Sequence, residues 1–553
     1  MHFHLIGLNC RYSHSCLALF YARSELHLHL QNPQTTISQF TINDPYYETL
    51  LRISGSSADV LFFSVYIWNA SYISRLVTDL ALIQPGRPIV LGGPQATALK
   101  RLPENCTVVD GAIEGAGEGF YHNLEAGNLK SSYMAKSGRP FQFPYLDEDF
   151  SGELLNRQVY YESSRGCPFN CSYCLSSVDK GVVHKEVKQV EEELECILRH
   201  QPKIIKFVDR TFNDNPERAL AIWHYLAAQP GKTQFHFEIA PDRFTEEMFA
   251  FLKTVGPDRF RFEIGIQSTN PETLAAVNRK MDVETAAGNI SRLTAFDNIH
   301  LHVDLILGLP CETGESFRKS FNRVFALRAH YIQMGLLKVL PGTAISNDAE
   351  DLGIVSCEQP PYQVLANRWM DHKTMSTLYA FGECVEAFYN SRCFRSIWTY
   401  LLKRKEEPFH FFKQLLEVSG RPHYFGLAAT QEMLTRIFCE MVDDRPDRDI
   451  LRELLRYDWL RCGHRFLPDF LEAEPLAEVR SKLWKKLPQN LEGLYTCQSR
   501  SEFFKRAVFL EISRDALLEV GLHPHDQRTL ICLLPEQTQG VIKHSRAVTV
   551  ECE

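Results

Sequence analysis

Three cysteines on one short loop constrain this chain more than any other feature of its sequence. Cys167, Cys171 and Cys174 stand in the stretch Cys-Pro-Phe-Asn-Cys-Ser-Tyr-Cys, directly after an apolar run that we expect to form a strand. Three thiolates in this spacing can hold three irons of a [4Fe–4S] cube and leave the fourth iron without a protein ligand. Structural zinc sites need four protein ligands, and no fourth ligand follows at zinc-ribbon spacing. The sequence therefore predicts an iron–sulfur site with one open iron.

The chain around this loop alternates apolar runs with helical patterns. Six runs predict buried parallel strands: Val159–Ser163, Ile204–Val208, Phe235–Ile239, Arg261–Ile266, Leu301–Leu307 and Leu336–Leu340. Helical patterns separate them at Val187–Arg199, Pro216–Ala228, Thr245–Val255, Val283–Phe296 and Ser316–His330. We therefore expect residues 158–345 to form a partial (β/α)6 TIM barrel, since the eight-unit barrel needs about 250 residues.

Two other regions flank the predicted barrel. In residues 1–125, strands at Phe3–Gly7, Val60–Val65 and Ile89–Leu91 and helices such as Ile73–Leu82 predict a doubly wound, Rossmann-like α/β domain. Residues 126–157 are polar and rich in glycine and proline, which indicates a linker. Residues 346–553 predict a mainly helical extension, with helices at Gln363–Tyr389 and Arg448–Trp459 and strands at Val508–Ile512 and Thr529–Leu534.

Composition narrows the class of protein. Hydrophobic residues make up 44% and charged residues 23%, an ordinary globular balance. The net charge of −8 gives no basic footprint for DNA, although a local patch for RNA stays open. No apolar run approaches the roughly 20 residues of a spanning helix, and the N-terminus predicts a buried strand rather than a signal peptide. We expect a cytoplasmic protein whose 16 cysteines are mostly reduced and buried.

The cysteine motif closely resembles the signature of the radical S-adenosylmethionine (SAM) enzymes, in which an aromatic residue, here Tyr173, precedes the third cysteine. The resemblance implies that Cys167, Cys171 and Cys174 bind the cluster and that SAM chelates the open iron. It also implies that an electron from the cluster cleaves SAM to a 5′-deoxyadenosyl radical, which abstracts hydrogen from a substrate. A reducing partner such as flavodoxin or ferredoxin is implied as well.

The resemblance covers roughly residues 158–345 and implies SAM contacts at strand ends. These are Tyr173 near the adenine, Asp209 at the methionine amino group, Gln267 and Ser268 at the ribose, and Gly308 in the adenine strand. The first four have a structural alternative. Tyr173 can be a packing aromatic, Asp209 a helix cap, and the Gln267–Ser268 pair a set of hydrogen bonds between barrel layers.

Residues 1–125 resemble the cobalamin-binding domain that precedes the barrel in one radical SAM subgroup. The resemblance and the glycine-rich turns place the cobalamin contacts at Ser64, Gly92, Gly93, Thr97, Gly115, Gly117 and Glu118. The Asp-x-His-x-x-Gly motif that puts histidine on cobalt is absent, and the nearby His14 is expected to be structural. Related radical enzymes also lack this motif, so we expect cobalamin without a histidine ligand. A degenerate domain that no longer binds cobalamin is the alternative.

The leading functional hypothesis is a cobalamin-dependent radical SAM methyltransferase acting on an unactivated carbon. Radical cyclisation or rearrangement with the same cofactors is an alternative. Methylthiotransfer to RNA is a second, but that class needs three further cluster cysteines, and only Cys10, Cys16 and Cys106 precede the barrel, in no cluster spacing. A non-catalytic cobalamin or redox sensor is a third. The sequence does not distinguish a small-molecule substrate from a peptide.

Overall fold

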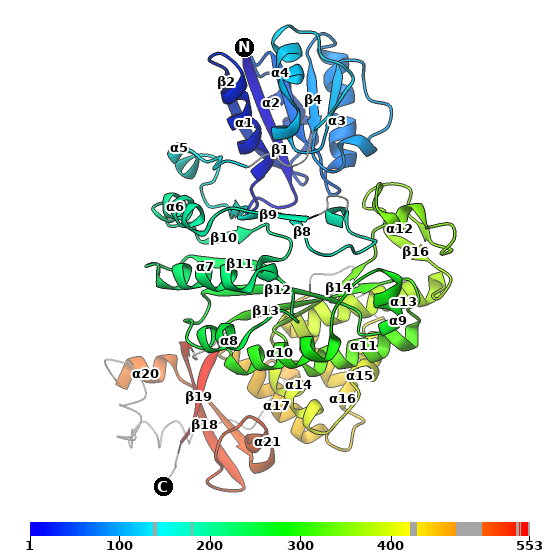
Figure 1. The fold of residues 1–553 in the computed structure, drawn as a ribbon. Coiled ribbons are helices and arrows are strands. Elements are labelled where there is room, and N and C mark those ends of the chain that lie inside the picture. The colour runs from blue at the N-terminus through cyan, green and yellow to red at the C-terminus, as the bar shows by residue number, and fades with distance from the viewer. Residues whose placement is uncertain are drawn as a thin grey trace.

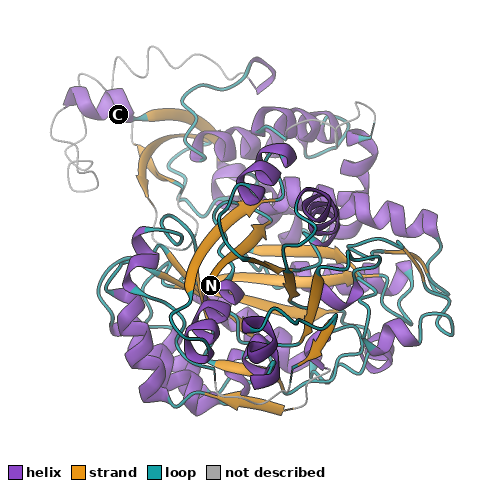
Figure 2. Cartoon of the chain, turned by 90° about the horizontal axis from the view of Figure 1, so that it is seen from above, coloured by secondary structure: helices purple, strands orange, loops and turns teal. Residues whose placement is uncertain are grey.

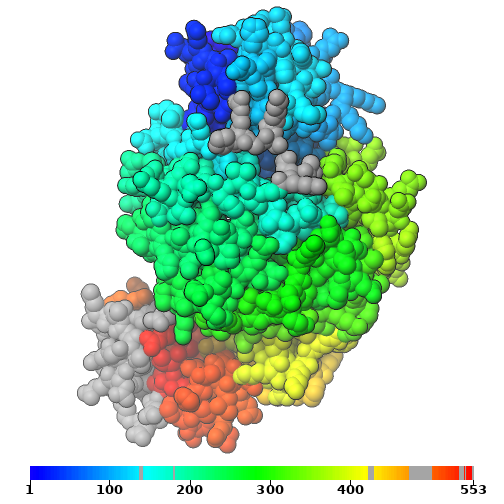
Figure 3. Space-filling view, viewed as in Figure 1, coloured from blue at the N-terminus to red at the C-terminus, as the bar shows by residue number. Residues whose placement is uncertain are grey.

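The computed structural model describes residues 1–135, 141–177, 181–420, 429–471, 500–537, 541 and 544–550. Residues 136–140 of the predicted linker and 472–499 of the predicted extension lie outside the described residues. Three parts follow one another down the molecule (Figures 1 and 3). The N-terminal domain lies on the barrel, and the C-terminal helices and sheet lie at the opposite end.

The N-terminal domain is built on a six-stranded parallel sheet in the order β2-β1-β3-β4-β5-β6. Its strands are β1 (His2–Asn9), β2 (Gln34–Thr41), β3 (Val60–Ser64), β4 (Ile89–Gly92), β5 (Cys106–Asp110) and β6 (Ser132–Met134). Its helices are α1 (Leu17–His29), α2 (Tyr46–Ser54), α3 (Ala70–Ile83), α4 (Glu118–Glu125) and the short η1 (Ala96–Ala98) and η2 (Ile113–Gly115). Separate apolar cores cover the two faces of the sheet, which confirms the doubly wound fold. Strand β6 belongs to this sheet although it lies in the range predicted as linker.

The second sheet is also six-stranded and parallel, and its strands follow chain order, as predicted for the barrel. They are β7 (Val159–Tyr161), β10 (Ile204–Phe207), β11 (Gln234–Ile239), β12 (Phe260–Gln267), β13 (His300–Leu307) and β14 (Tyr331–Leu336). The last strand begins at Tyr331 and not at the predicted Leu336. Its half-exposed residues at the sheet edge lack the apolar pattern on which that prediction relied.

Helices surround this sheet, which Figure 2 shows from the side of the N-terminal domain. They are α5 (Asp147–Ser151), α6 (Val187–Leu198), η4 (Phe212–Asp214), α7 (Pro216–Ala228), α8 (Glu246–Leu252), α9 (Pro271–Ala276), α10 (Val283–Phe296) and α11 (Gly314–Ala326). A two-stranded antiparallel hairpin of β8 (Ser164–Cys167) and β9 (Gly181–His184) follows the first strand, and η3 (Leu175–Ser177) lies between its strands.

The two faces of the barrel sheet differ in polarity. On the outer face, apolar side chains pack against helices, and the Trp223 ring of α7 lies 5.3 Å from the Phe262 ring and 6.1 Å from the Phe237 ring, centroid to centroid. The inner face carries ionisable side chains at alternate positions: Lys206, His236, Glu238, Arg261, Glu263, His302 and Asp304. Aromatic burial therefore fixes the outer face and leaves a polar interior.

The C-terminal region is mainly helical and ends in a three-stranded antiparallel sheet. Its elements are α12 (Ala344–Asn347), β15 (Val355–Ser356), β16 (Val364–Ala366), α13 (His372–Cys384), the π-helical η5 (Val385–Asn390), α14 (Arg395–Lys403), α15 (Pro408–Ser419), α16 (Gln431–Val442), α17 (Arg448–Arg461), η7 (Asp469–Leu471), α20 (Arg500–Arg506), β17 (Val508–Ser513), α21 (Arg514–Glu519), β18 (Arg528–Gln537) and β19 (Ser545–Val550). The helix predicted from Gln363 starts only at His372, because the Asp371 side chain caps it and β16 occupies the residues before it.

The barrel and the C-terminal helices share one apolar core. Phe321 and Phe325 of α11 contact the rings of Phe381, Trp398 and Phe412 from three C-terminal helices. This packing covers the side of the sheet at which β14 ends the partial barrel. None of the described helices combines the length and the apolar character that crossing a membrane requires.

Candidate active site

The cysteine loop starts from a strand whose geometry depends on one glycine. Strand β8 ends at Cys167, and Gly166 next to it has φ +99° and lies opposite Val182 of β9. A Cβ at Gly166 would lie less than 3.0 Å from the carbonyl oxygen of Gly181. Only glycine allows this close approach together with this backbone conformation, so Gly166 fixes where the first cysteine is placed.

Two distant segments hold the rest of the loop. The backbone N–H of Ser172 donates to the carbonyl of Val277, and the N–H of Ile345 donates to the carbonyl of Ser172. The Asn278 side chain donates to the carbonyl of Asn170 at 3.1 Å. The turn after α9 and the start of α12 therefore clamp the loop that carries the cysteines.

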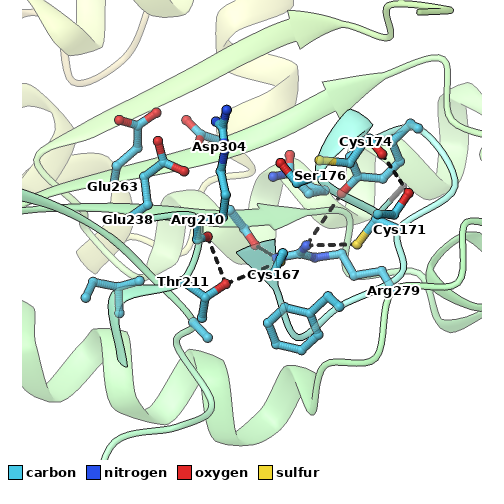
Figure 4. Close-up of a pocket in the computed structure, with 17 residues that line it drawn as sticks. Cys167, Cys171, Cys174, Ser176, Arg210, Thr211, Glu238, Glu263, Arg279 and Asp304 are labelled. Atoms are coloured by element: carbon cyan, nitrogen blue, oxygen red, sulfur yellow. Dashed lines mark hydrogen bonds between the residues drawn. The ribbon is translucent and has the colours of Figure 1, made fainter. Parts of the chain in front are cut away.

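A cavity of about 180 Å³ lies between this loop and the carboxyl half of the barrel strands (Figure 4). All three cysteines line it, together with Tyr173, Arg210, Thr211, Glu238, Glu263, Gln267, Arg279 and Asp304. Burial raises the pKa of the Cys167 thiol, so a metal has to displace its proton on binding. The structure thus brings the three predicted cluster ligands to one wall of a single cavity.

The three cysteines are not arranged around one ion. Among the described residues, no group of three His, Cys, Asp or Glu side chains is placed to hold a single metal ion. Each cysteine of a three-cysteine [4Fe–4S] site binds a different iron. A triad spread over one cavity wall is therefore compatible with a cluster.

Arg279 is a cation of this cavity that the sequence analysis did not single out. Its guanidinium donates to the Cys171 sulfur and to the Tyr173 hydroxyl, both at 3.5 Å, and to the carbonyl of Gly265. Arg279 lies in a turn more than 100 residues from Cys171, and nothing in the local sequence indicates the contact.

Three carboxylates face the cysteines from neighbouring strands: Glu238 of β11, Glu263 of β12 and Asp304 of β13. Burial raises the pKa of Glu238 to about 7 and also raises that of Asp304. For Glu263, burial raises the pKa. A hydrogen bond from His236 and the charge of Lys206, 3.0 Å away, outweigh burial, so the net pKa of Glu263 is lowered. The site therefore holds carboxyl groups that differ in protonation near neutral pH.

A sequence signal for these carboxylates exists. Residues 235–238 read Phe-His-Phe-Glu, residues 260–263 read Phe-Arg-Phe-Glu, and residues 301–304 read Leu-His-Val-Asp. In each, apolar positions alternate with a basic residue and then an acid. Since side chains alternate between the faces of a strand, this pattern indicates an ionisable inner face.

The predicted SAM contacts separate into two groups. Tyr173 and Gln267 line the cavity. Gln267 has φ +70°, and its buried Oε1 has no hydrogen-bond partner within the protein. The other three, Asp209, Ser268 and Gly308, are buried outside the lining.

Asp209 binds the segment that precedes the cysteine loop. Its carboxylate accepts hydrogen bonds of 2.5–2.8 Å from the N–H and hydroxyl of Ser163 and from the hydroxyl of Ser164. These residues join β7 to β8. The geometry therefore favours a positioning role for Asp209 over the predicted contact with the methionine amino group.

Ser268 and Gly308 are also engaged within the protein. The Ser268 hydroxyl donates to Oε1 of Glu312 at 2.6 Å, and both residues are fully buried. Gly308 has φ +85°, its carbonyl accepts from Asn367, and a Cβ there would lie 2.7 Å from the Val364 side chain. The close approach expected at Gly308 is thus an approach to the C-terminal region.

The predicted cobalamin contacts all lie at the carboxyl edge of the first sheet, either at the last residues of β3 and β4 or in the segments that follow β4 and β5: Ser64, Gly92, Gly93, Thr97, Gly115, Gly117 and Glu118. Gly93 has φ +98°, and a Cβ there would lie 2.6 Å from the carbonyl of Val65. Thr97 and Glu118 are exposed, whereas Ser64 is buried beside the Cys16 thiol and the Tyr66 hydroxyl.

This edge faces the hairpin that carries Cys167 (Figure 1). Glu114 of η2 pairs with Arg165 of β8 at 2.9 Å. Burial raises the pKa of Tyr66, while the nearby Arg210 of the cavity lowers it, which puts the end of β3 close to that cavity. The two domains therefore meet where each has its strand carboxyl ends.

An aromatic pair stands at the same edge. The rings of Tyr66 and Trp68 stack at 4.4 Å and 5°, and Trp68 is 44% exposed. The Trp68 indole N–H donates to the carbonyl of Leu8. His14 is engaged elsewhere, since its Nδ1 lies 2.6 Å from the Tyr160 hydroxyl at the domain interface.

Two family profiles match the chain. Residues 161–324 match the family described as "Radical SAM superfamily", and residues 350–515 match the family described as "Protein of unknown function (DUF4080)". The first match covers the cysteine loop and most of the barrel, and the second covers most of the C-terminal helices.

Curated relatives are distant. The chain is 26% identical over 328 residues, 52% of its length and 48% of the relative's, to the cobalamin-dependent radical SAM methyltransferase TokK of Streptomyces tokunonensis. It is 23% identical over 448 residues, 69% of its length, to the 2-(S-pantetheinyl)-carbapenam-3-carboxylate methyltransferase of Streptantibioticus cattleyicolor, of which 63% is covered. The chain thus spans about half to three fifths of the length of these relatives.

A solved structure shares the fold. The apo form of the cobalamin-dependent S-adenosylmethionine radical enzyme OxsB matches with a TM-score of 0.56 at 14% identity. The match covers 88% of this chain and 75% of that one. The likeness in fold therefore extends over most of both chains.

Proposed function

This chain is a radical SAM enzyme by its residues 161–324, and we propose that it transfers a methyl group with a [4Fe–4S] cluster, SAM and cobalamin. The observation that carries the proposal is the cavity between the cysteine triad and the strand ends, next to which the first sheet presents its own carboxyl edge. The substrate, a small molecule or a peptide, is left open.

The residues on the cavity wall fit an iron–sulfur cluster. Cys167, Cys171 and Cys174 would hold it, since they are free thiols on one loop with a cation beside the second. When bound, the cluster supplies the electron that cleaves SAM to the 5′-deoxyadenosyl radical. A reducing protein such as flavodoxin or ferredoxin would deliver that electron.

The other cavity residues would orient SAM and exclude water. The Oε1 of Gln267 is a buried acceptor without a protein donor, which is costly unless a ligand such as a ribose hydroxyl donates to it. Tyr173 closes the cavity beside the cluster loop and is held there by Arg279. Glu238 would hold or release a proton at its carboxyl group on the substrate side, because its pKa is about 7.

Cobalamin would lie at the carboxyl edge of the first sheet. The turns at Gly92 and Gly117 are open, since a Cβ added to either glycine would have no other atom within 4 Å. The stacked Tyr66–Trp68 pair offers a flat aromatic surface beside them. A large planar cofactor suits such an edge. When bound, cobalamin would supply the methyl group.

The N-terminal cysteines argue against methylthiotransfer to RNA. Cys16 is buried in the core on one face of the first sheet, and Cys106 is buried in the core on the other face. The sheet separates them, so they cannot share a second cluster. Cyclisation and rearrangement use the same cofactors, and the likeness to two methyltransferases favours methyl transfer over both.

Anaerobic reconstitution with iron and sulfide tests the cluster. We expect about four irons per chain and a thiolate-to-iron absorption band, with 5′-deoxyadenosine formed from SAM under a reductant. Cys167→Ala, Cys171→Ala and Cys174→Ala should each lose the band. Cys311 is a free cysteine that does not line the cavity, so Cys311→Ala should keep it. A band that survives in the triad variants would refute the assignment.

Cobalamin binding is tested separately by equilibrium dialysis with methylcobalamin. We expect one cobalamin per chain, with no imidazole nitrogen splitting in the electron paramagnetic resonance spectrum of the Co(II) form. Gly93→Val should abolish binding, because its side chain meets the Val65 backbone. Splitting that disappears in His14→Ala would contradict binding without a histidine ligand, and absence of binding would favour the degenerate-domain alternative.

A further inference from the structure

Apart from the three cysteines of the cluster loop, a pair of cysteines lies at the opposite end of the barrel. Cys393 shortly precedes α14, and Cys462 follows the last residue of α17. The charge of Arg395, two residues after Cys393, lowers the pKa of Asp297 and of His330, which precede β13 and β14. The pair is therefore beneath the amino ends of the barrel strands, whereas the cluster loop is at their carboxyl ends.

The Cys462 thiol reaches the backbone of Cys393 although 69 residues separate the two cysteines in sequence. The two side chains are close enough for each to shift the pKa of the other. The Cys462 sulfur lies 3.9 Å from the Cys393 carbonyl oxygen, and the Cys393 sulfur lies 3.5 Å from the Ser391 carbonyl oxygen. Both cysteines are only partly buried, so a small reagent can reach them.

The surroundings are electropositive. Three arginines, Arg392, Arg395 and Arg461, lie close enough to His544 to lower its pKa further, in addition to burial. Of these, Arg461 pairs with the fully buried Asp458 at 2.8 Å. His544 in turn lies 4.0 Å from the Cys462 sulfur. More guanidinium groups than carboxylates thus surround the dithiol.

This environment makes Cys393 the nucleophile of the pair. The hydrogen bond from Cys462 is the largest influence on the pKa of Cys393 and lowers it. Burial and the charge of Asp458 raise this pKa, whereas Ser391 and Arg461 lower it. The pKa of Cys393 is about 7. The same interaction raises the pKa of Cys462. A thiolate beside a neutral thiol is the arrangement of dithiols that undergo exchange.

We propose that Cys393 and Cys462 are a redox-active dithiol that closes to an intramolecular disulfide by exchange with a low-molecular-weight disulfide. The Cys393 thiolate attacks one sulfur of the reagent, and the first small thiolate leaves. Cys462 then loses its proton and attacks the Cys393 sulfur, which expels the second small thiolate. The protein loses two electrons and two protons, and the reagent gains them as two thiols.

A metal site made of Cys393, Cys462 and His544 is the competing assignment. Among the residues that the structure describes, these three are not placed to hold one ion. The approach of the Cys462 sulfur to the Cys393 backbone, together with the mutual pKa shift of the two side chains, instead favours a bond between the two cysteines.

Oxidised glutathione is the probe, applied anaerobically to the full-length protein so that any cluster is preserved. Digestion and mass spectrometry should give a cross-linked peptide pair containing residues 393 and 462, two hydrogens lighter than the reduced pair and reversed by dithiothreitol. Cys393→Ser and Cys462→Ser should lower its yield at least tenfold. Cys439→Ser is the matched control, since this cysteine of α16 is buried and its pKa is raised to about 11; it should leave the yield unchanged.

The pH dependence of alkylation separates a tuned dithiol from two adjacent cysteines. The iodoacetamide rate at Cys393 should reach half its maximum near pH 7, and Cys462→Ala should move this midpoint upward by at least one pH unit. Persistent mixed disulfides at both sulfurs without the cross-link would overturn the proposal. Stoichiometric Zn²⁺ binding that is lost in Cys393→Ser would overturn it in favour of a metal site.

Discussion

Replacing Gly166 by alanine tests how strictly the hairpin before Cys167 is built. Alanine at φ +99° costs about 1–3 kcal/mol for the backbone alone. The overlap of its Cβ with the carbonyl oxygen of Gly181 adds about 1–3 kcal/mol, as for an overpacked site. Gly231→Ala is the control, since Gly231 has φ +93° and open space around it, so that only the first cost applies.

Two measurements follow from this difference. In anaerobic urea unfolding, Gly166→Ala should lower the midpoint by clearly more than Gly231→Ala does. Because β8 has to move away from β9 to accept the methyl group, Cys167 moves with it, and reconstituted iron should fall below half of the wild-type content. Gly231→Ala should keep its iron. Equal midpoints for the two variants, or full iron in Gly166→Ala, would refute the reasoning.

Three further variants probe the buried polar groups. Asp209→Ala leaves three donors at Ser163 and Ser164 unpaired, so the free energy of unfolding should fall by about 3–5 kcal/mol. Its iron content should fall as well. A stable, iron-loaded variant that binds SAM weakly in calorimetry would instead support the predicted contact between Asp209 and SAM. Arg279→Gln should retain the fold but slow cluster assembly, followed by absorbance, and an unchanged rate would exclude a role for its charge. Burial raises the folded-state pKa of Glu312 to about 7, above its usual 4.5. Wild-type stability should therefore fall by on the order of 3 kcal/mol as pH rises from 4.5 to 7, and urea midpoints of Glu312→Gln should lack this fall.

Most of the parallel strands could be predicted because burial on both faces or on one face leaves an apolar run or a regular alternation, but β2, β5 and β6 of the first sheet were not predicted. The strand β2, with the sequence Gln-Thr-Thr-Ile-Ser-Gln-Phe-Thr, was not predicted. It is an edge strand, and only its last two residues are fully buried. The same reason explains the shifted prediction for β14. Edge strands form through backbone pairing with a neighbour, which a sequence pattern does not record.

The candidate site was predictable only where chemistry is local in sequence. Three cysteines within eight residues identify themselves by spacing. Arg279 reaches Cys171 through a turn that tertiary packing places, and Asp209 faces Ser163 and not the cavity because of the direction in which its strand ends. Position at a strand end was therefore a correct guide to the neighbourhood of the site and an insufficient guide to the direction of a side chain.

The shared core between α11 and the C-terminal helices has a consequence for how the molecule unfolds. The rings of Phe321 and Phe325 contact Phe381, Trp398 and Phe412. Each region therefore buries part of its apolar surface only against the other. Separating them would expose several aromatic side chains, each worth about 1.5–3 kcal/mol when buried. We therefore expect the two regions to unfold as one cooperative unit. A truncated protein that contains the barrel without these helices would leave one side of the shared apolar core exposed to water.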